Sequence, residues 1–257
     1  MNQWIVLYQK ELLFRWRNKQ LLWFPLVLTL LALVDPLTYY YLPEIIELSG
    51  GLPEGAVFEV ASLEAHEAVR LGLDQLSLLG SLIVLALAMG TIAGERQKGI
   101  AEIMFTKPIR PLHYITAKWA SLATMNLIGL FIALFLNWYY TSILYGELSF
   151  TLFIQLYIFY SLWFLSLLAL NMVWSAFSSK PGVVFGLSAL VLFLSFLIQT
   201  AFGHRLPYFP LQLNDHLEAL LQTETVSKEL ALTSGILASS CLIFLTSATL
   251  IFRYKRL

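Results

Sequence analysis

Six long apolar stretches constrain this chain more than any other feature, and they cover residues 20–41, 74–93, 114–140, 151–177, 182–203 and 231–252. An α-helix rises about 1.5 Å per residue, so about 20 residues cross a hydrocarbon layer about 30 Å thick, and each stretch is long enough. In lipid every backbone N–H and C=O must be hydrogen-bonded within the protein, and these runs are too continuous for the alternating strands of a barrel. The sequence therefore predicts an all-α polytopic membrane protein with six transmembrane helices.

The composition excludes a soluble fold, because 58% of the residues are hydrophobic and only 12% are charged. We therefore treat residues 1–257 as a single transmembrane domain. Its outer loops are 42–73 and 204–230, and the first of them is too short to bury a core of its own. The single cysteine, Cys241, lies in an apolar stretch, so the sequence offers neither a disulfide framework nor a Cys/His metal site.

The charges are sorted along the chain, although the net charge is zero. Thirteen of the sixteen Lys and Arg lie at the two termini, between the second and third spans, or just before the fifth span. Basic residues accumulate on the cytoplasmic side of a membrane protein. The pattern predicts a protein of the cytoplasmic membrane with both termini and the 94–113 loop in the cytoplasm. Only three acids, Glu11, Glu95 and Glu102, fall on that side.

Residues 1–19 have the pattern of an amphipathic helix. In helical projection one polar and one aromatic stripe appear, formed by Gln3, Lys10 and Arg17 and by Trp4, Tyr8, Leu12 and Trp16. We expect this helix to lie in the cytoplasmic membrane interface; the alternative is that it extends the first span. A basic segment of this length without a cleavage site is not typical of a signal peptide.

The 94–113 loop is highly charged but contains one apolar helical face. Ile100, Ile103 and Met104 recur at i, i+3 and i+4, and Pro108 and Pro111 end the helix. An apolar face exposed to the cytosol indicates a docking partner. The alternative is an ordinary basic loop that contacts nothing.

The same loop carries a longer pattern: Glu-Arg-x-x-Gly-Ile-x-Glu, a short apolar run, Thr-x-Pro-Ile-Arg, and a Lys that opens the next span. The positions are Glu95, Arg96, Gly99, Ile100, Glu102, Thr106, Pro108, Ile109, Arg110 and Lys118. With the six spans, the amphipathic leader and the acidic first outer loop, this pattern resembles the permease subunits of type-2 ABC exporters over essentially the whole chain.

That resemblance implies a coupling helix at residues 99–107, between spans two and three, which docks into a groove of a separate ATPase subunit. It implies two permease subunits, as a homodimer or heterodimer, and two ATPase subunits that bind ATP and Mg²⁺. In this chain we expect Arg96, Lys98 and Glu102 to fix the docking register. The apolar docking area is expected to come from Ile100, Ile103, Met104 and Phe105, in a coupling set that also includes Glu95, Gly99, Thr106, Pro108 and Arg110.

Enzymatic readings of the sequence are weak, and we expect no catalytic, cofactor-binding or metal site. Gly94 and Gly99 have the spacing of a P-loop, but Ile100 and Ala101 stand where Lys and Ser or Thr are needed. The zinc-protease-like start at His66 lacks the second histidine. The sequence gives no indication of nucleic-acid binding.

Three polar residues within the spans, Asp35, Asn126 and Asn171, are candidates for intramembrane contacts with substrate. Asp35 could equally line a water pocket or a cap, and interhelical hydrogen bonds would explain the asparagines. The apolar, aromatic spans suit an amphipathic peptide, drug or lipid as substrate. The competing interpretation is a membrane scaffold or immunity-type protein that transports nothing; an ion channel is disfavoured because no span carries a polar stripe.

Overall fold

The computed structural model describes residues 3–48, 63–104, 106 and 109–254, and every regular element within them is helical. In chain order the elements are α1 Gln3–Arg17, α2 Gln20–Tyr40, α3 Leu42–Leu48, α4 Ala65–Gln75, the π-helical segment η1 Leu76–Gly80, α5 Ser81–Ala88, α6 Ala93–Gln97, α7 Ile100–Met104, α8 Pro111–Leu144, α9 Phe150–Phe177, α10 Pro181–Phe202, the 3-10 turns η2 Gly203–Arg205 and η3 Pro210–Gln212, α11 Leu213–Thr223 and α12 Lys228–Tyr254.

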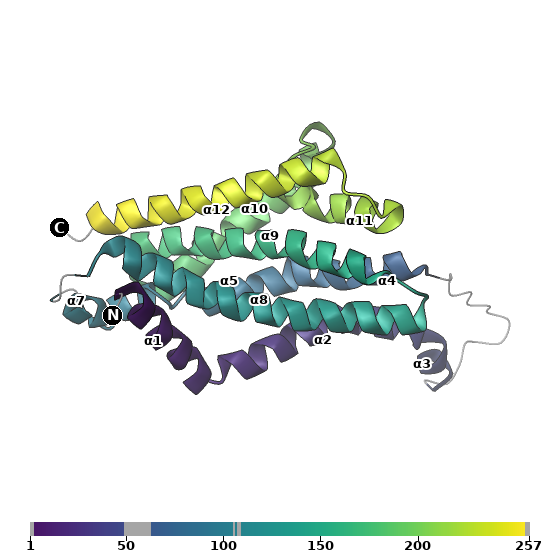
Figure 1. Ribbon diagram of the computed structural model, residues 1–257, viewed down its shortest axis with the longest axis horizontal. Helices are drawn as coiled ribbons and strands as arrows, with labels where there is room; N and C mark the ends of the chain where they lie inside the picture. Colours follow the sequence, from purple (N-terminus) through teal and green to yellow (C-terminus); the bar gives the residue numbers. More distant parts are fainter. Residues whose placement is uncertain (1–2, 49–62, 105, 107–108, 255–257) are drawn as a thin grey trace.

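Six helical runs among the described residues are long and apolar enough to cross a membrane, which confirms the all-α, six-span fold. Figure 1 shows them side by side, with α1, α7 and the end of α12 at one end of the bundle. We call this the basic end. The opposite end carries α3, the start of α4, and α11.

The second span differs most from its predicted bounds of 74–93. The helical run begins at Ala65 and continues through α4, η1, α5 and α6 to Gln97. The run begins early because Glu64 and Glu67 form a capping box. The hydrogen bonds of a capping box fix the N-terminus of a helix independently of hydropathy. Residues 65–73 of the predicted outer loop are therefore helical. Residues 49–62 of that loop lie outside the described part of the chain.

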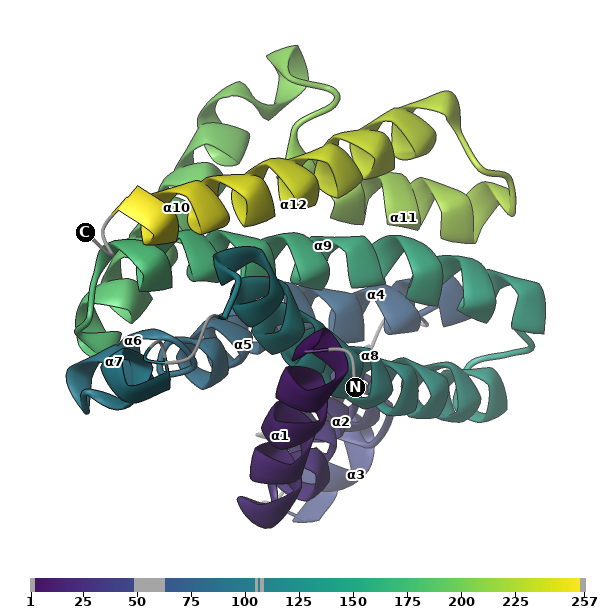
Figure 2. The same cartoon turned by 60° about the vertical axis from the view of Figure 1, so that its left-hand side comes forward.

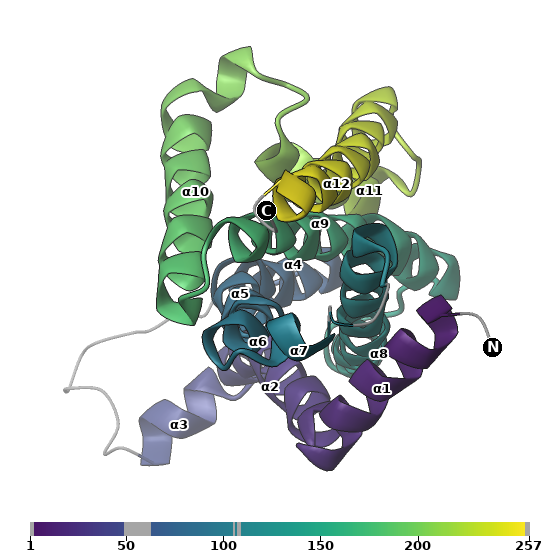
Figure 3. The same ribbon diagram turned by 90° about the vertical axis from the view of Figure 1, so that its left-hand side faces the viewer.

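Helices α8 and α9 form the centre of the bundle (Figures 2 and 3). Helices α1 and α2 pack on α8, while α12 and α10 pack on α9. Within an apolar segment of 18 residues in α9, 61% of the residues are buried. The corresponding segments of α10 and α12 are only 17% and 22% buried. The peripheral helices therefore present most of their apolar surface to the surroundings of the chain.

Helix α1 is a separate element, so the alternative that residues 1–19 extend the first span is wrong. The chain turns at Lys19, whose φ of 55° is left-handed, before α2 begins. Helix α1 packs on α8, where Trp4 Nε1 donates to Thr116 Oγ1 at 3.0 Å. Its buried residues are Leu7, Glu11 and Arg15, and its exposed apolar residues are Ile5, Val6, Leu13, Phe14 and Trp16. An exposed apolar face is what a helix in a membrane interface presents to lipid.

Helix α4 approaches α2 and α8 closely at Gly72. A Cβ atom at this position would collide with the backbone carbonyl oxygen of Ala32 and with Nδ2 of Asn137. These two groups are already engaged, since Asn137 Nδ2 donates to Ala32 O at 2.6 Å. The three helices can meet here only because residue 72 has no side chain.

We expect Gly72→Ala to lower the midpoint of thermal unfolding in detergent, because overpacking of a close contact costs about 1–3 kcal/mol. The matched control is Gly235→Ala, in exposed α12, where an added Cβ meets no atom within 4 Å. This control should leave the midpoint unchanged or raise it, since Ala favours a helix over Gly. A Gly72→Ala protein as stable as the parent would contradict the close approach.

Candidate functional site

Four charged side chains from three separate elements meet at the basic end. We call Lys10 and Glu11 of α1, Glu95 of α6 and Lys118 of α8 the charge cluster. Lys10 Nζ lies 2.7 Å from Glu95 Oε1 and 3.0 Å from Glu11 Oε1. Lys118 Nζ lies 2.8 Å from Glu11 Oε1 and 3.0 Å from Glu95 Oε2. Each lysine therefore bridges the same two carboxylates.

Lys118 is the most deeply placed member of the charge cluster, with 2% of its surface exposed. An ammonium group has three N–H donors, and its third acceptor is the backbone oxygen of Thr91, at 2.9 Å. A buried charge is tolerated only where it is paired and fully hydrogen-bonded. The cluster satisfies both conditions, so it fixes α1 and α6 onto α8.

Glu95 also accepts a hydrogen bond from the hydroxyl of Tyr114, at 2.7 Å. Its neighbour Arg96 turns toward the other half of the bundle, where Nη1 donates to the backbone oxygen of Ala176 at 2.7 Å. Ala176 lies in the last turn of α9, where unpaired carbonyl groups and the helix dipole favour a cation. Two adjacent residues thus join the 94–113 loop to α8 and to α9.

Helix α7 extends beyond these anchors. It follows Gly99, whose φ of 70° permits the turn out of α6. Ile103 is 71% exposed and Ile100 is 40% exposed, while Ala101 is buried and Met104 is partly buried. The apolar face that the sequence predicts is therefore present and mostly uncovered.

Of the other predicted coupling residues, some are exposed and some point into the protein. Lys98, Glu102, Thr106 and Arg110 are exposed. Arg96, in contrast, points into the protein, so its guanidinium is used in holding α6 to α9 rather than being presented outward with Lys98 and Glu102. Phe105 and Pro108 lie outside the described residues.

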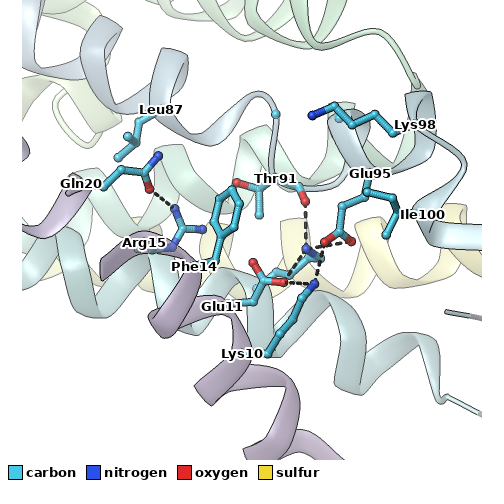
Figure 4. Close-up of a pocket in the computed structure, with 13 residues that line it drawn as sticks. Lys10, Glu11, Phe14, Arg15, Gln20, Leu87, Thr91, Glu95, Lys98 and Ile100 are labelled. Atoms are coloured by element: carbon cyan, nitrogen blue, oxygen red, sulfur yellow. Dashed lines mark hydrogen bonds and ion pairs between the residues drawn. The ribbon is translucent and has the colours of Figure 1, made fainter. Parts of the chain in front are cut away.

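A cavity of about 400 Å³ separates α1 from α5 and α6 beside the charge cluster (Figure 4). Arg15 and Gln20 lie at one end, and the charge cluster lies at the other, with Phe14 between them. Leu87, Thr91, Lys98 and Ile100 contribute to the lining. The cavity is therefore bounded on one side by the amphipathic helix and on the other by the 94–113 loop.

Two basic residues of α1 have shifted pKa values. Burial lowers the pKa of Lys10, but its hydrogen bond to Glu95 and the nearby charge of Glu11 more than offset this effect, and the net shift is upward. Burial lowers the pKa of Arg15 to about 10, and the charge of Glu11 opposes that shift only in part. Both side chains are cationic at neutral pH.

The intramembrane candidates lie apart from the charge cluster. Asp35 accepts a hydrogen bond from Gln75 Nε2 at 2.7 Å, which links α2 to α4. Asn171 donates to Leu85 O and Ser188 Oγ, both at 3.3 Å, so it joins three helices. Asn126 is 1% exposed, and its amide has no hydrogen-bond partner among the described residues.

Sequence reasoning missed the roles of Glu11, Arg15 and Lys118. Lys118 entered only as part of a motif, and Glu11 and Arg15 were counted only as charges that indicate orientation. One signal was available: Glu11 is an acid in a strongly basic segment, so it needs a cationic partner nearby.

Comparison with known proteins places the chain among membrane transport proteins. Residues 5–252 match the family described as "ABC-2 family transporter protein". The chain is also 30% identical, over 197 residues, to the "Uncharacterized transmembrane protein YxlG" of Bacillus subtilis (strain 168). That similarity covers 75% of this chain and 76% of the relative.

We expect Lys118→Met to reduce the amount of folded protein and to increase sensitivity to unfolding by sodium dodecyl sulfate. Removing one partner of a buried ion pair costs about 3–5 kcal/mol, because the remaining charges are left uncompensated. The control Lys98→Met removes an exposed lysine from the same end and should have little effect. The double variant Lys118→Met with Glu11→Gln should recover part of the loss; equal behaviour of the single and double variants would contradict the pairing.

Proposed function

The chain belongs to the ABC-2 family of transporter proteins, and on this premise we propose that it is the transmembrane subunit of an ATP-driven exporter. The ATPase is a separate polypeptide that binds ATP and Mg²⁺. The substrate class that suits the apolar and aromatic spans is an amphipathic peptide, drug or lipid. The observation that carries the proposal is the exposed apolar helix α7, held on a rigidly anchored loop at the basic end.

In this proposal α7 is the coupling helix, and its tip enters a groove of the ATPase. Ile103 and Ile100 supply the apolar area, because both are exposed and lie on the same short helix. Lys98 and Glu102 are exposed beside them and provide charges of both signs for orientation. An uncovered apolar side chain of this size at a polar end of the protein favours a protein partner.

The anchors of the loop suggest how movement of α7 reaches the spans. Glu95 is bonded to Lys10 and Lys118, so a displacement of α6 acts on α1 and α8. Arg96 is bonded to Ala176, so the same displacement acts on the end of α9. The ion pair between Glu95 and the buried Lys118 resists separation, and the loop therefore transmits force instead of absorbing it.

The assembly we propose contains two permease subunits, identical or related, and two ATPase subunits. Only 17%, 22% and 28% of the residues in the apolar segments of α10, α12 and α2 are buried. This leaves apolar faces for a second permease subunit as well as for lipid. We place the complex in the cytoplasmic membrane with the basic end inside, since the basic residues gather at that end.

We expect Ile103→Asp to abolish copurification of the ATPase while the permease still inserts and folds, because a charge on the tip of α7 cannot enter an apolar groove. The experiment is affinity purification of the permease from cells that also produce a candidate ABC ATPase from the same genome. Ile45→Asp, an exposed isoleucine of α3 at the other end of the bundle, is the matched control. Undiminished copurification with Ile103→Asp would contradict the docking assignment.

The orientation is tested by labelling single cysteines with a membrane-impermeant maleimide, in a background with Cys241→Ser. Lys98→Cys and Gln222→Cys place exposed thiols at the basic end and on α11. We expect Gln222→Cys to react in intact cells and Lys98→Cys to react only after permeabilisation. The opposite result would put α7 on the outer surface, away from any ATPase.

A further inference from the structure

One buried cation of α1, Arg15, has no function in the coupling proposed above. Arg15 is 2% exposed, and the hydrogen bonds that its guanidinium donates to described residues go only to neutral groups. Nε donates to Ser121 Oγ and Nη1 donates to Gln20 Oε1, each at 3.2 Å. No ion pair of the described residues includes Arg15.

The charges that line the cavity do not balance. Lys10 and Lys118 are matched by Glu11 and Glu95, with which they form the charge cluster. Arg15 lines the same cavity, together with Lys98 at its exposed edge. The cavity therefore carries two cations in excess of its carboxylates.

Arg15 remains charged at this position. Burial lowers its pKa to about 10, which still leaves the guanidinium protonated at neutral pH. Glu11 compensates this buried charge only in part and forms no ion pair with it, and the remaining N–H groups of Arg15 have no acceptor among the described residues. A planar guanidinium with free donors suits the oxygens of a phosphate group.

Two of the side chains that line the cavity are apolar and exposed. Phe14 of α1 is 55% exposed and Ile100 of α7 is 40% exposed, and both line the cavity. Next to them α1 and α2 expose large apolar side chains to the surroundings, among them Leu13, Trp16, Leu22 and Trp23. A molecule with an anionic head and an apolar body is complementary to this arrangement.

We propose that the cavity between α1 and α6 binds a phosphate group, and that this phosphate is the headgroup of an anionic phospholipid in the adjacent leaflet. The headgroup lies between Arg15 and Lys98, and the acyl chains lie along the exposed apolar side chains of α1 and α2. The bound lipid joins the turn between α1 and α2 to the 94–113 loop. This inference rests on the proposed function only in taking α1 as a helix of the cytoplasmic interface.

The test uses the full-length permease in phosphatidylcholine nanodiscs, without an ATPase. Phosphatidylglycerol is titrated into the discs, and binding is followed by native mass spectrometry and by hydrogen exchange of residues 12–22. We expect phosphatidylglycerol to protect these residues more than phosphatidylcholine does. Arg15→Gln and Lys98→Gln should each weaken binding about tenfold, which corresponds to the loss of one charge-assisted hydrogen bond.

Arg17→Gln is the matched control, since it removes an exposed arginine from the same helix, outside the cavity. It corrects for the general attraction of anionic lipid to basic residues at the membrane surface. A loss with Arg17→Gln equal to that with Arg15→Gln, or no loss with either cavity variant, would overturn the site. If Arg15→Gln does not fold, Lys98→Gln decides alone, because its side chain is exposed.

A second arm replaces the lipid with inorganic phosphate in pure phosphatidylcholine discs. Protection of residues 12–22 by phosphate as strong as that by phosphatidylglycerol would overturn the assignment of the anion to a lipid. Because no ATPase is present in either arm, failure of lipid binding is distinguishable from failure of the coupling proposal, which copurification tests.

Discussion

The ammonium group of Lys118 is enclosed where water cannot solvate it, and the arrangement of the basic end follows from that constraint. Moving such a charge out of water costs several kcal/mol, so it persists only with close counter-charges and acceptors for all its protons. Glu11 comes from the N-terminal helix and Glu95 comes from the loop after the second span. Satisfying one lysine therefore brings two distant segments of the chain against α8.

A loop that passes force from a motor to a bundle must be stiff at its base and accessible at its tip. The 94–113 loop combines these properties within a few residues. Glu95 and Arg96 are held on opposite sides, by the charge cluster and by the last turn of α9. Beyond Gly99 the chain turns away, and Ile103 is left uncovered. This combination is what the coupling role proposed for α7 requires.

On a soluble protein an amphipathic helix buries its apolar face and exposes its charges, and α1 does the reverse. Its buried face carries Glu11 and Arg15, and its exposed face carries large apolar side chains. In a membrane interface this reversal is favourable, because lipid accepts the apolar face while the protein supplies partners for the charges. The same reversal places Arg15 in the cavity beside the charge cluster, which is the basis of the proposed lipid site.

The sequence by itself determined the class of fold, the number of spans and the family. An apolar run must be long enough to cross the hydrocarbon layer and must hydrogen-bond its own backbone, and a motif such as Glu95-Arg96 is a run of neighbouring residues. All of these can be read from consecutive positions. It did not determine where the second span begins, since the N-terminus of that helix is fixed by a capping box at Glu64 and not by hydropathy. Nor did it pair Glu11 with Lys118, 107 residues apart, or turn Arg96 inward. Those choices belong to the tertiary structure, because the sign and number of charges are local properties, whereas the partner of a buried charge is set by which helices pack together.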